Sequence, residues 1–330
     1  MTDAPTAVQY GVGPIGSRVV ETAVDRGYEF VGAVDVDPDK VGRDLGAVAG
    51  IDDLGVEITE DADAALAADP DVVFNSTLSD LDAVRPQIEQ AMAAGADVVS
   101  TCEEMAYPWR ANPEVAAALD KAAREHGQTC LGTGINPGFA MDAFPAVLTG
   151  ANRRVDSVYV ERVQDAATRR GPLQEKIGAG TDVDTFEAEI ATEAGHVGLP
   201  ESVAMLGAAL GWELDSIEES IEPVVAEERV ESDYVTVEAG EVAGIHQVGE
   251  GIVDGETRIE LDLSMYLGAP DPHDEVKVEG VPDLHTVVEG GFHGDVTTPA
   301  VVVNMVPSIR DADPGLVTML DVAPPTCREL

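Results

Sequence analysis

The sequence predicts an α/β fold: a doubly wound parallel sheet, followed by a second, α+β domain with an open mixed sheet. Three observations carry this prediction. Short apolar runs alternate with helical stretches over about the first 140 residues, as in strands joined by crossover helices. A glycine-rich turn at residues 11–16 separates the first apolar run from the first helical stretch. From about residue 153 the pattern changes to long β-like runs with polar alternation.

The expected elements of the first domain follow from apolar runs and helix-end signals. Asn112 and Pro113 mark the start of one helix and Gly127 its end, while Asp37 is expected to cap a helix that begins at Pro38. Strands are expected at residues 7–10, 28–34, 56–59, 71–77, 96–101 and 128–132. Helices are expected at residues 17–26, 38–45, 61–68, 81–95, 113–127 and 140–148.

The remainder of the chain reads as a second domain with a returning segment. Strands are expected at residues 155–163, 234–238 and 258–266, with one helix at residues 200–210, and the acidic stretch 216–231 as a solvated edge. Residues 298–307 read as a helix or buried run that returns to the first domain. The predicted boundaries are a parallel-sheet domain at 1–140, an α+β domain at 141–295, and a segment at 296–330 that returns to the first domain.

The charge balance of the chain is extreme. It carries 63 acidic residues against 19 basic ones, a formal net charge of −44 at pH 7, spread along the whole sequence. Such a surface repels itself at ordinary ionic strength, and molar salt, with a screening length of about 3 Å, removes most of the repulsion. The composition therefore resembles that of a cytoplasmic protein from a salt-accumulating halophile. The same negative field repels nucleic acid, so no nucleic-acid partner is expected.

Several classes of protein and site are not expected. No apolar run of about 18 residues exists, so no membrane span is predicted. The first residues lack the basic and apolar segments of a signal peptide, and a cytoplasmic location is expected. Cys102, Cys130 and Cys327 form no C-x-x-C pair, and the six histidines form no H-x-x-x-H pair. Neither a disulfide framework nor a metal site is therefore predicted.

Residues 11–16 read Gly-Val-Gly-Pro-Ile-Gly and lie between an expected strand and an expected helix. This is the dinucleotide-binding fingerprint in its proper context. The first glycine makes a tight turn, the second lets the backbone approach a pyrophosphate, and the third lets the helix pack on the strand. The N-terminus of the helix offers unpaired N–H groups to the phosphates. The residues expected to bind the cofactor here are Gly11, Gly13, Pro14, Ile15 and Gly16.

Asp35 ends the second apolar run, about 20 residues after the last glycine. A carboxylate at this position accepts hydrogen bonds from the adenosine ribose and repels a 2′-phosphate, which favours NAD over NADP. Asp37 is the better cap for the next helix, which leaves Asp35 for the ribose. Lys40 and Arg43 are close enough to help bind a phosphate, so NADP stays open as a cofactor.

Polar residues follow the fourth and sixth expected strands, and ligands of open α/β sheets bind beyond the carboxyl ends of the strands. Asn75, Ser76 and Thr77 end the fourth strand, and we expect them to contact the cofactor, although a capping role for the next helix is an alternative. In the loop at 132–139, Asn136 and Pro137 are expected to lie against a flat ring of the cofactor or substrate. A plain turn is the alternative there.

The fifth strand ends in the most suggestive catalytic segment, which runs from Thr101 through Cys102 to Glu103 and Glu104. A carboxylate near a nicotinamide can hold a substrate ammonium, take its proton, or stabilise a developing iminium cation. Thr101 is expected to contact the cofactor, and Cys102 is expected to be a buried structural thiol. The alternative for the two glutamates is a solvated pair in a very acidic protein.

One further candidate lies in the second domain. His196 precedes the helix expected at 200–210 and could bind a substrate carboxylate or carbonyl beside the helix N-terminus. A surface or capping histidine is the alternative.

Several segments together resemble one family. They are the glycine fingerprint, V-G-A-V-D with V-G-R-D-L-G soon after, S-T-C-E-E-M-A-Y-P and G-T-G-I-N-P-G-F. They look like the 2,4-diaminopentanoate dehydrogenase group of the dihydrodipicolinate-reductase-like dehydrogenases, over about the first 140 residues. The resemblance implies a Rossmann domain, a second α+β domain, a homodimer and NAD(P)-dependent oxidative deamination of an amine or its reverse. It places the family's acidic catalytic residue at Glu103 or Glu104.

Two departures narrow the resemblance. The sequence has no His-His pair, which dihydrodipicolinate reductases carry in their substrate-binding segment, and it has Cys102-Glu103 where homoserine dehydrogenases place Asn-Lys. We therefore predict an NAD(P)-dependent oxidoreductase acting on the C–N bond of a small amine or diamino acid such as 2,4-diaminopentanoate. One alternative is a dihydrodipicolinate-reductase-like enzyme that reduces a C=C or C=N bond. The other is a non-enzymatic Rossmann protein that senses NAD(H).

Overall fold

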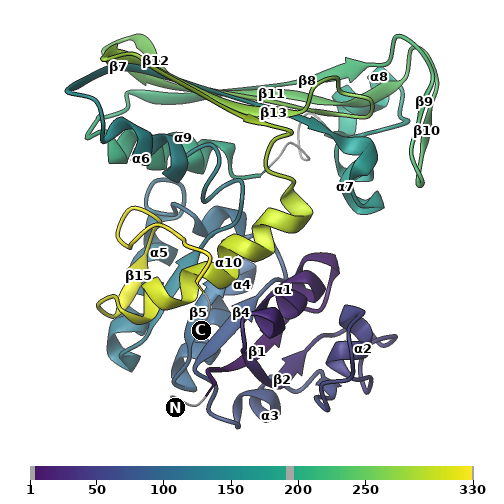
Figure 1. Ribbon diagram of the computed structural model, residues 1–330, viewed down its shortest axis with the longest axis vertical. Helices are drawn as coiled ribbons and strands as arrows, with labels where there is room; N and C mark the ends of the chain where they lie inside the picture. The colour runs from purple at the N-terminus through teal and green to yellow at the C-terminus, as the bar shows by residue number, and fades with distance from the viewer. Residues whose placement is uncertain (1–3, 191–196, 329–330) are drawn as a thin grey trace. The chain divides into compact units, whose positions relative to one another are not determined.

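The computed structural model describes residues 4–190 and 197–328, and the chain divides into two compact units (Figure 1). The first unit comprises Met1–Phe139 and Gly294–Leu330, and the second comprises Ala140–His293. The chain therefore leaves the first unit, builds the second, and returns to the first.

The first unit is built on a parallel sheet, with seven strands among the described residues, in the order β15-β6-β5-β4-β1-β2-β3. The strand order reverses between β1 and β4, which is where ligands bind in doubly wound sheets. The strands are β1 (Thr6–Tyr10), β2 (Glu29–Val34), β3 (Ile58–Thr59), β4 (Val72–Asn75), β5 (Asp97–Ser100), β6 (Thr129–Gly132) and β15 (Gly315–Val317).

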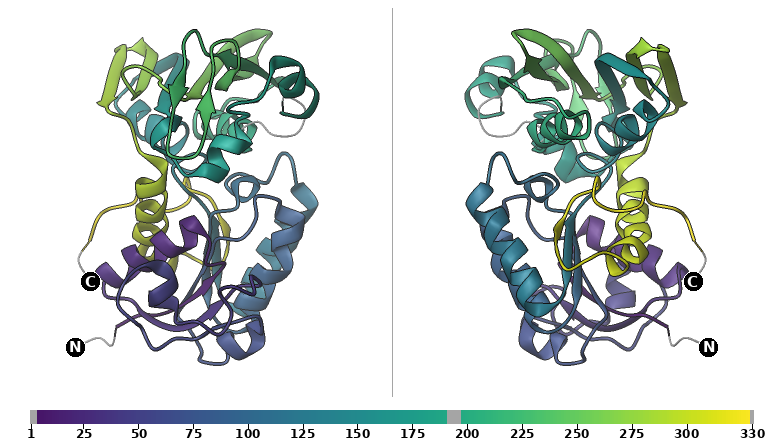
Figure 2. Two further views of the ribbon diagram at one scale, coloured as in Figure 1. Left: turned by 90° about the vertical axis from the view of Figure 1, so that its right-hand side faces the viewer. Right: turned by 90° about the vertical axis from the view of Figure 1, so that its left-hand side faces the viewer.

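Helices lie on both faces of this sheet (Figure 2). Two of them, α1 and α10, pack together, as do α4 and α5. Because both faces are covered, β4, β5 and β6 are almost wholly buried, as their apolar sequences predict. The helical segments are α1 (Pro14–Asp25), α2 (Leu45–Ala49), α3 (Ala62–Leu66), α4 (Leu81–Ala93), the 3-10 turn η1 (Glu103–Met105), α5 (Pro113–His126) and α10 (Gly294–Arg310). None of the described helices is both long and apolar enough to cross a membrane.

One predicted helix of the first unit is wrong. Residues 38–43 form turns rather than a helix from Pro38, and Asp37 caps only a turn, where its carboxylate accepts the amide of Asp39 at 2.9 Å. The helix starts later, at α2, because Asp44 is its cap. The Asp44 carboxylate accepts five backbone amides in all, those of Gly46, Ala47, Leu54, Gly55 and Val56.

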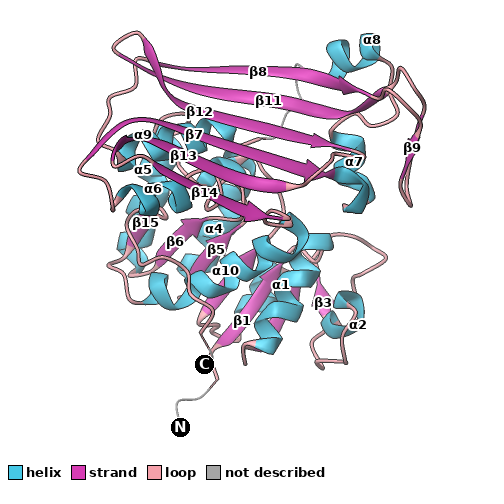
Figure 3. Cartoon of the chain, turned by 45° about the horizontal axis from the view of Figure 1, so that its top comes forward, coloured by secondary structure: helices cyan, strands magenta, loops and turns pink. Residues whose placement is uncertain are grey.

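The second unit is built on a mixed sheet, with six strands among the described residues, in the order β14-β13-β7-β12-β11-β8 (Figure 3). Only β7 and β12 pair in parallel, and the other neighbours are antiparallel. A short hairpin, β9 with β10, forms a separate sheet. The strands are β7 (Arg154–Asp165), β8 (Ser216–Val225), β9 (Val230–Glu231), β10 (Thr236–Val237), β11 (Val242–Val253), β12 (Glu256–Tyr266), β13 (His273–Val281) and β14 (Leu284–Glu289).

Helices α6 and α9 cover one face of the mixed sheet (Figure 1). The predicted helix at 140–148 begins only at Ala143, because Asp142 is its cap and accepts the Ala143 amide at 2.6 Å. The acidic stretch from residue 216 forms β8, the edge strand. The helical segments among the described residues of this unit are α6 (Ala143–Thr149), η2 (Ala166–Thr168), α7 (Gly171–Lys176), α8 (Val183–Thr185), η3 (Phe186–Ile190) and α9 (Leu199–Ala209). The helix expected at 200–210 is α9, and η2, α7, α8 and η3 were not expected.

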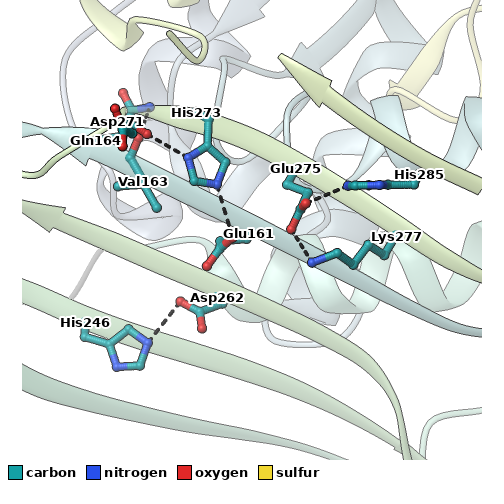
Figure 4. A network of polar contacts seen from close by, with 10 residues as sticks. All are labelled: Glu161, Val163, Gln164, His246, Asp262, Asp271, His273, Glu275, Lys277 and His285. Carbon is teal, nitrogen blue, oxygen red and sulfur yellow. Dashed lines mark hydrogen bonds and ion pairs between the residues drawn. The ribbon is translucent and has the colours of Figure 1, made fainter. Parts of the chain in front are cut away.

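The other face of the mixed sheet carries histidine–carboxylate pairs that join neighbouring strands (Figure 4). The contacts run from His246 Nε2 to Asp262 at 2.9 Å, from His273 Nε2 to Glu161 at 3.1 Å, and from His285 Nε2 to Glu275 at 2.6 Å. Lys277 also pairs with Glu275. These alternate residues point away from the apolar face, as expected for a sheet with one exposed side.

Under the covered face lies a buried ion pair between Arg162 on β7 and Asp274 on β13, each side chain 2% exposed. Both residues also hold the backbone of Phe292. Arg162 donates to its carbonyl at 2.6 Å, and Asp274 accepts its amide at 2.6 Å. The pair therefore fixes the segment that follows β14.

Candidate active site

The three glycines of the fingerprint differ in the space around them. Gly11 has a φ of +86°, and a Cβ there would lie 2.5 Å from the Ser76 carbonyl oxygen. A Cβ on Gly16 would lie 2.0 Å from the carbonyl oxygen of Gly11. At Gly13 a Cβ would meet nothing within 4 Å. Gly11 and Gly16 are thus fixed by the fold, whereas Gly13 leaves open space, as a phosphate-binding loop requires.

The N-terminus of α1 also suits an anion. Gly13 is its N-cap residue and provides no side-chain cap, Pro14 follows, and the first turn contains no acidic residue. Its first amides therefore have no side-chain acceptor, and such orphan amides with the helix dipole favour a bound phosphate.

Asp35 follows β2 directly. Its carboxylate accepts the amides of Val12 at 2.7 Å and Asp37 at 2.9 Å, and Lys40 Nζ lies 3.2 Å from it. Burial works against the charged form, but the two amides and Lys40 outweigh it and hold the pKa of Asp35 below its usual value. Asp35 is therefore a fixed, ionised acceptor at the strand end.

The residues after β4 divide into two kinds. Asn75 donates to Gln87 Oε1 at 2.7 Å and accepts the Ser100 hydroxyl at 3.0 Å. Thr77 also donates to Gln87 Oε1, at 2.8 Å. Gln87 lies on α4, so these contacts tie the strand end to that helix. The buried Ser76 hydroxyl, by contrast, has no hydrogen-bond partner within the described part of the chain.

The two glutamates after β5 also differ. Glu104 accepts the backbone amide of Leu81 at 2.8 Å, and so satisfies one of the first amides of α4. The Glu103 carboxylate makes no hydrogen bond or ion pair with any described residue, and its side chain is half-buried. The Glu104 carboxylate is therefore used to cap α4, whereas the Glu103 carboxylate is available to bind a ligand.

Thr101 and Cys102 precede the glutamates. Thr101 continues the parallel pairing, its amide donating to the Asn75 carbonyl at 2.9 Å. The Cys102 thiol is buried and donates to the Ser79 carbonyl at 3.0 Å, and burial raises its pKa to about 12. This agrees with the expectation of a structural thiol, since the thiolate is the reactive form.

The loop after β6 contains buried polar groups without partners. Asn136 is 8% exposed, and neither atom of its amide has a hydrogen-bond partner among the described residues. The same holds for the hydroxyl of Thr133, which is 2% exposed. The Ile135 amide donates to Thr298 on α10 at 3.3 Å, so the returning helix supports this loop. Unpaired buried polar groups are costly, and a bound ligand is one way to satisfy them.

Sequence reasoning missed Thr133. Its only signal was its place in the segment G-T-G-I-N-P-G-F, just after a buried strand. His196, the substrate-binding candidate of the second domain, lies outside the described residues. Within the ranges described, no group of three or more His, Cys, Asp or Glu residues could hold a metal ion.

Together these features fit a dinucleotide cofactor. Four features follow the carboxyl ends of strands in one parallel sheet: the open space at Gly13, the uncapped start of α1, the ionised Asp35, and the buried groups without a partner in the described ranges. These buried groups belong to Ser76, Thr133 and Asn136. Fold and site therefore define an NAD(P)-dependent dehydrogenase of the Rossmann type.

Comparison with known proteins gives the family. The profile of the 2,4-diaminopentanoate dehydrogenase C-terminal domain matches residues 139–329, and that of the dihydrodipicolinate reductase N-terminus matches residues 8–102. A 2,4-diaminopentanoate dehydrogenase of Acetoanaerobium sticklandii is 37% identical over 281 residues, covering 83% of this chain and 79% of that protein. The chain belongs to the 2,4-diaminopentanoate dehydrogenase family.

Solved structures agree with this placement. The structure of an amine dehydrogenase from Mycobacterium smegmatis matches with a TM-score of 0.87 and 28% identity, over 98% of each chain. A WlbA dehydrogenase from Bordetella pertussis, solved with NADH and UDP-GlcNAcA, matches with a TM-score of 0.56 and 16% identity, which shows a shared fold. An amine dehydrogenase of Streptomyces virginiae is 28% identical, with 96% of each chain covered.

Proposed function

We propose that this NAD(P)-dependent amine dehydrogenase oxidises the C–N bond of a small diamino acid, such as 2,4-diaminopentanoate, and catalyses the reverse reductive amination. The observation that carries the proposal is the Glu103 carboxylate, which has no hydrogen-bond or ion-pair partner within the described ranges, at the carboxyl end of a central strand. A free anion at this edge suits a cationic substrate. The names of the relatives, a 2,4-diaminopentanoate dehydrogenase and amine dehydrogenases, support the same class of substrate.

Glu103 would bind the substrate ammonium and take its proton. When bound, the nicotinamide cofactor supplies the acceptor for the hydride that leaves the amine carbon. Glu103 would pass that proton on to water and become an anion again, and it would then stabilise the positive charge that develops on the amine carbon and nitrogen as the C–H electron pair leaves. Water would then add to this carbon, its protons would pass from the added oxygen to the nitrogen, and the C–N bond would break to leave a carbonyl and ammonium.

The other proposed site residues position the reactants. The Asn136 amide and the Thr133 hydroxyl offer buried hydrogen-bonding groups, and Pro137 forms part of the same loop. Gly11, Gly13, Pro14, Ile15 and Gly16 would hold the pyrophosphate, and Asp35 the adenosine ribose. The cofactor would also be contacted by the Ser76 hydroxyl and by the backbone groups of Asn75, Ser76, Thr77 and Thr101. His196 remains a candidate for binding the substrate carboxylate.

A substrate panel tests the reaction. Purified protein is assayed for NADH and NADPH formation with diamino acids, monoamino acids and simple amines, at low and at molar salt, because the net charge is −44. We expect turnover with diamino acids that carry an amine near the carboxylate. Dihydrodipicolinate is the contrasting substrate. Its reduction by NADPH, without turnover of any amine, would contradict the proposal and favour the reductase.

Two glutamate variants test the catalytic role. Glu103→Gln should lower kcat/KM by about 100- to 10,000-fold, the usual contribution of a general base, without lowering the melting temperature. Glu104→Gln is the matched variant and should mainly weaken the start of α4, with about 1 kcal/mol lost in stability. If Glu103→Gln kept full turnover while Glu104→Gln abolished it in a folded protein, the roles would be reversed.

We further propose that the enzyme acts as a homodimer in the cytoplasm. Support comes from the family resemblance, from the lack of membrane-spanning helices in the described part of the chain, and from the extended second sheet, which exposes one face. Light scattering during size-exclusion chromatography, at low and at molar salt, measures the mass directly. A monomer at every salt concentration would contradict the dimer.

A further inference from the structure

Asp35 is held in place mainly by backbone. Its two oxygens accept the amides of Val12 and Asp37, and its side chain is only 10% exposed. These amides belong to the fingerprint turn and to the segment just after β2. A change in a neighbouring side chain therefore leaves the carboxylate where the ribose end of a dinucleotide is bound in Rossmann folds.

Lys40 joins this carboxylate to a second one. Its Nζ lies 3.2 Å from Asp35 Oδ2 and 3.3 Å from Asp37 Oδ2, and its side chain is 24% exposed. An ammonium group carries three N–H donors. The two carboxylates use two of them within the described part of the chain, and the third has the partial exposure needed to reach a ligand.

The lysine also decides the local charge. Asp35 and Asp37 contribute two negative charges, and Lys40 cancels one of them. A 2′-phosphate carries about two negative charges of its own at neutral pH. Without Lys40 that phosphate would face two uncompensated carboxylates, whereas the uncharged ribose hydroxyl of NAD can donate to Asp35 in either case.

The nearby arginine is engaged differently. The Arg43 guanidinium is exposed and donates to the Asp39 carbonyl at 3.4 Å, and among the residues described it makes no hydrogen bond or ion pair with Asp35 or Asp37. Within the described ranges, Lys40 therefore contacts the Asp35 carboxylate and Arg43 does not. Arg43 therefore serves as a control of similar charge and position.

We propose that Lys40 sets the cofactor specificity of this enzyme, by offsetting Asp35 and Asp37 and donating a hydrogen bond to the 2′-phosphate of NADP. Lys40 makes the site accept both cofactors, although Asp35 alone would select NAD. The inference rests on the NAD(P) site of the proposed function and is independent of the amine chemistry.

Cofactor binding without any substrate tests this role. NADH and NADPH are titrated by fluorescence against the full-length wild-type protein, Lys40→Met, Lys40→Arg, Arg43→Met and Lys121→Met. Lys121 lies on α5 and pairs with Glu125, so its variant makes the same charge change elsewhere. We expect Lys40→Met to weaken NADPH binding by about tenfold, the usual effect of losing one charge-assisted hydrogen bond, and NADH binding by less than twofold.

The controls separate the possible outcomes. Lys40→Arg should restore most NADPH binding, and Arg43→Met and Lys121→Met should change the NADPH-to-NADH ratio by less than twofold. The Lys40 effect should also shrink as salt rises, because it is electrostatic. Equal weakening of both cofactors by Lys40→Met, or an unchanged ratio, would overturn the proposal. Neither result depends on finding the substrate, so a failure of the amine chemistry gives a different signature.

Discussion

The two sheets of this protein place their polar side chains differently. In the parallel sheet, both faces are covered by helices, and polar groups that lack a partner among the described residues, such as those of Ser76 and Asn136, follow the strand ends. In the mixed sheet, polar groups such as His273 and Glu161 lie along an open face and pair with each other across strands. Pairing across strands stabilises the sheet itself, whereas unpaired buried groups at strand ends are suited to bind a ligand.

The largest effect should come from the buried ion pair of the mixed sheet. Asp274→Leu leaves Arg162 buried without its counter-charge and should cost about 3–5 kcal/mol of unfolding free energy, measured by urea denaturation. The double variant Arg162→Met with Asp274→Leu should recover most of that loss. Arg229→Met, in an exposed pair, should cost less than about 1 kcal/mol. A loss below 1 kcal/mol for Asp274→Leu would show that the pair does not stabilise this sheet.

The glycine turn offers a matched pair on the parallel sheet. Gly16→Ala forces a Cβ to within 2.0 Å of a carbonyl oxygen and should cost about 1–3 kcal/mol. Gly13→Ala meets nothing within 4 Å and should change stability by less than about 0.5 kcal/mol. Both should weaken NADH binding, measured by fluorescence titration. Tight NADH binding by Gly13→Ala would contradict a ligand site at this strand end.

The Asp35→Ala variant tests whether the carboxylate at the end of β2 binds the adenosine ribose. It should weaken NADH binding by about tenfold, through loss of a charged acceptor for the ribose, and should leave NADPH binding unchanged or stronger. The ratio of the two dissociation constants is the measurement. An unchanged ratio would remove Asp35 from the ribose site.

The smallest effect should come from the open face of the mixed sheet. His273 contacts two acceptors, the Asp271 carbonyl at Nδ1 and the Glu161 carboxylate at Nε2, so the doubly protonated ring suits the site. The Asp271 contact and Glu161 raise the pKa of His273 above 6.5, against the effect of burial.

A folded-state pKa above the unfolded value means stability that is fully present below pH 6.5 and lost as the pH rises through the folded-state pKa. The stability difference between wild type and His273→Gln should therefore be largest near pH 6 and shrink by pH 9, with a change below about 1 kcal/mol. Denaturation curves across this range measure it. A difference that grows with pH would contradict the assignment.

The parallel sheet was largely predictable because its signals are local. The apolar runs predicted strands close to where the structure has them. Pro113 and Gly127 likewise marked the start and the end of α5. The prediction of a helix at 38–45 was wrong because the helix is capped by Asp44 and not by Asp37. The Asp44 carboxylate is held in place by backbone amides about ten residues further along the chain. Contacts of that range leave no periodic pattern in the sequence.

The sequence could place the candidate site residues after the expected strands, but it could not give the contacts that each of them makes. The strand ends pointed to Glu103, Glu104 and Asn136 as neighbours of a cofactor. Two of these contacts depend on how α4 packs against the sheet. Glu104 accepts the Leu81 amide, and Gln87 binds both Asn75 and Thr77. Thr133 was missed because its burial depends on how the surrounding loop folds. The sequence alone does not show whether a threonine hydroxyl has a hydrogen-bond partner.

The last strand of the parallel sheet, β15, pairs with β6, although more than 180 residues of chain lie between them. During synthesis on the ribosome, β6 therefore emerges long before its neighbour and remains an exposed sheet edge while the whole second unit is made. A chain cut short before Gly315 would lack the strand that covers this edge, and an unpaired sheet edge favours aggregation.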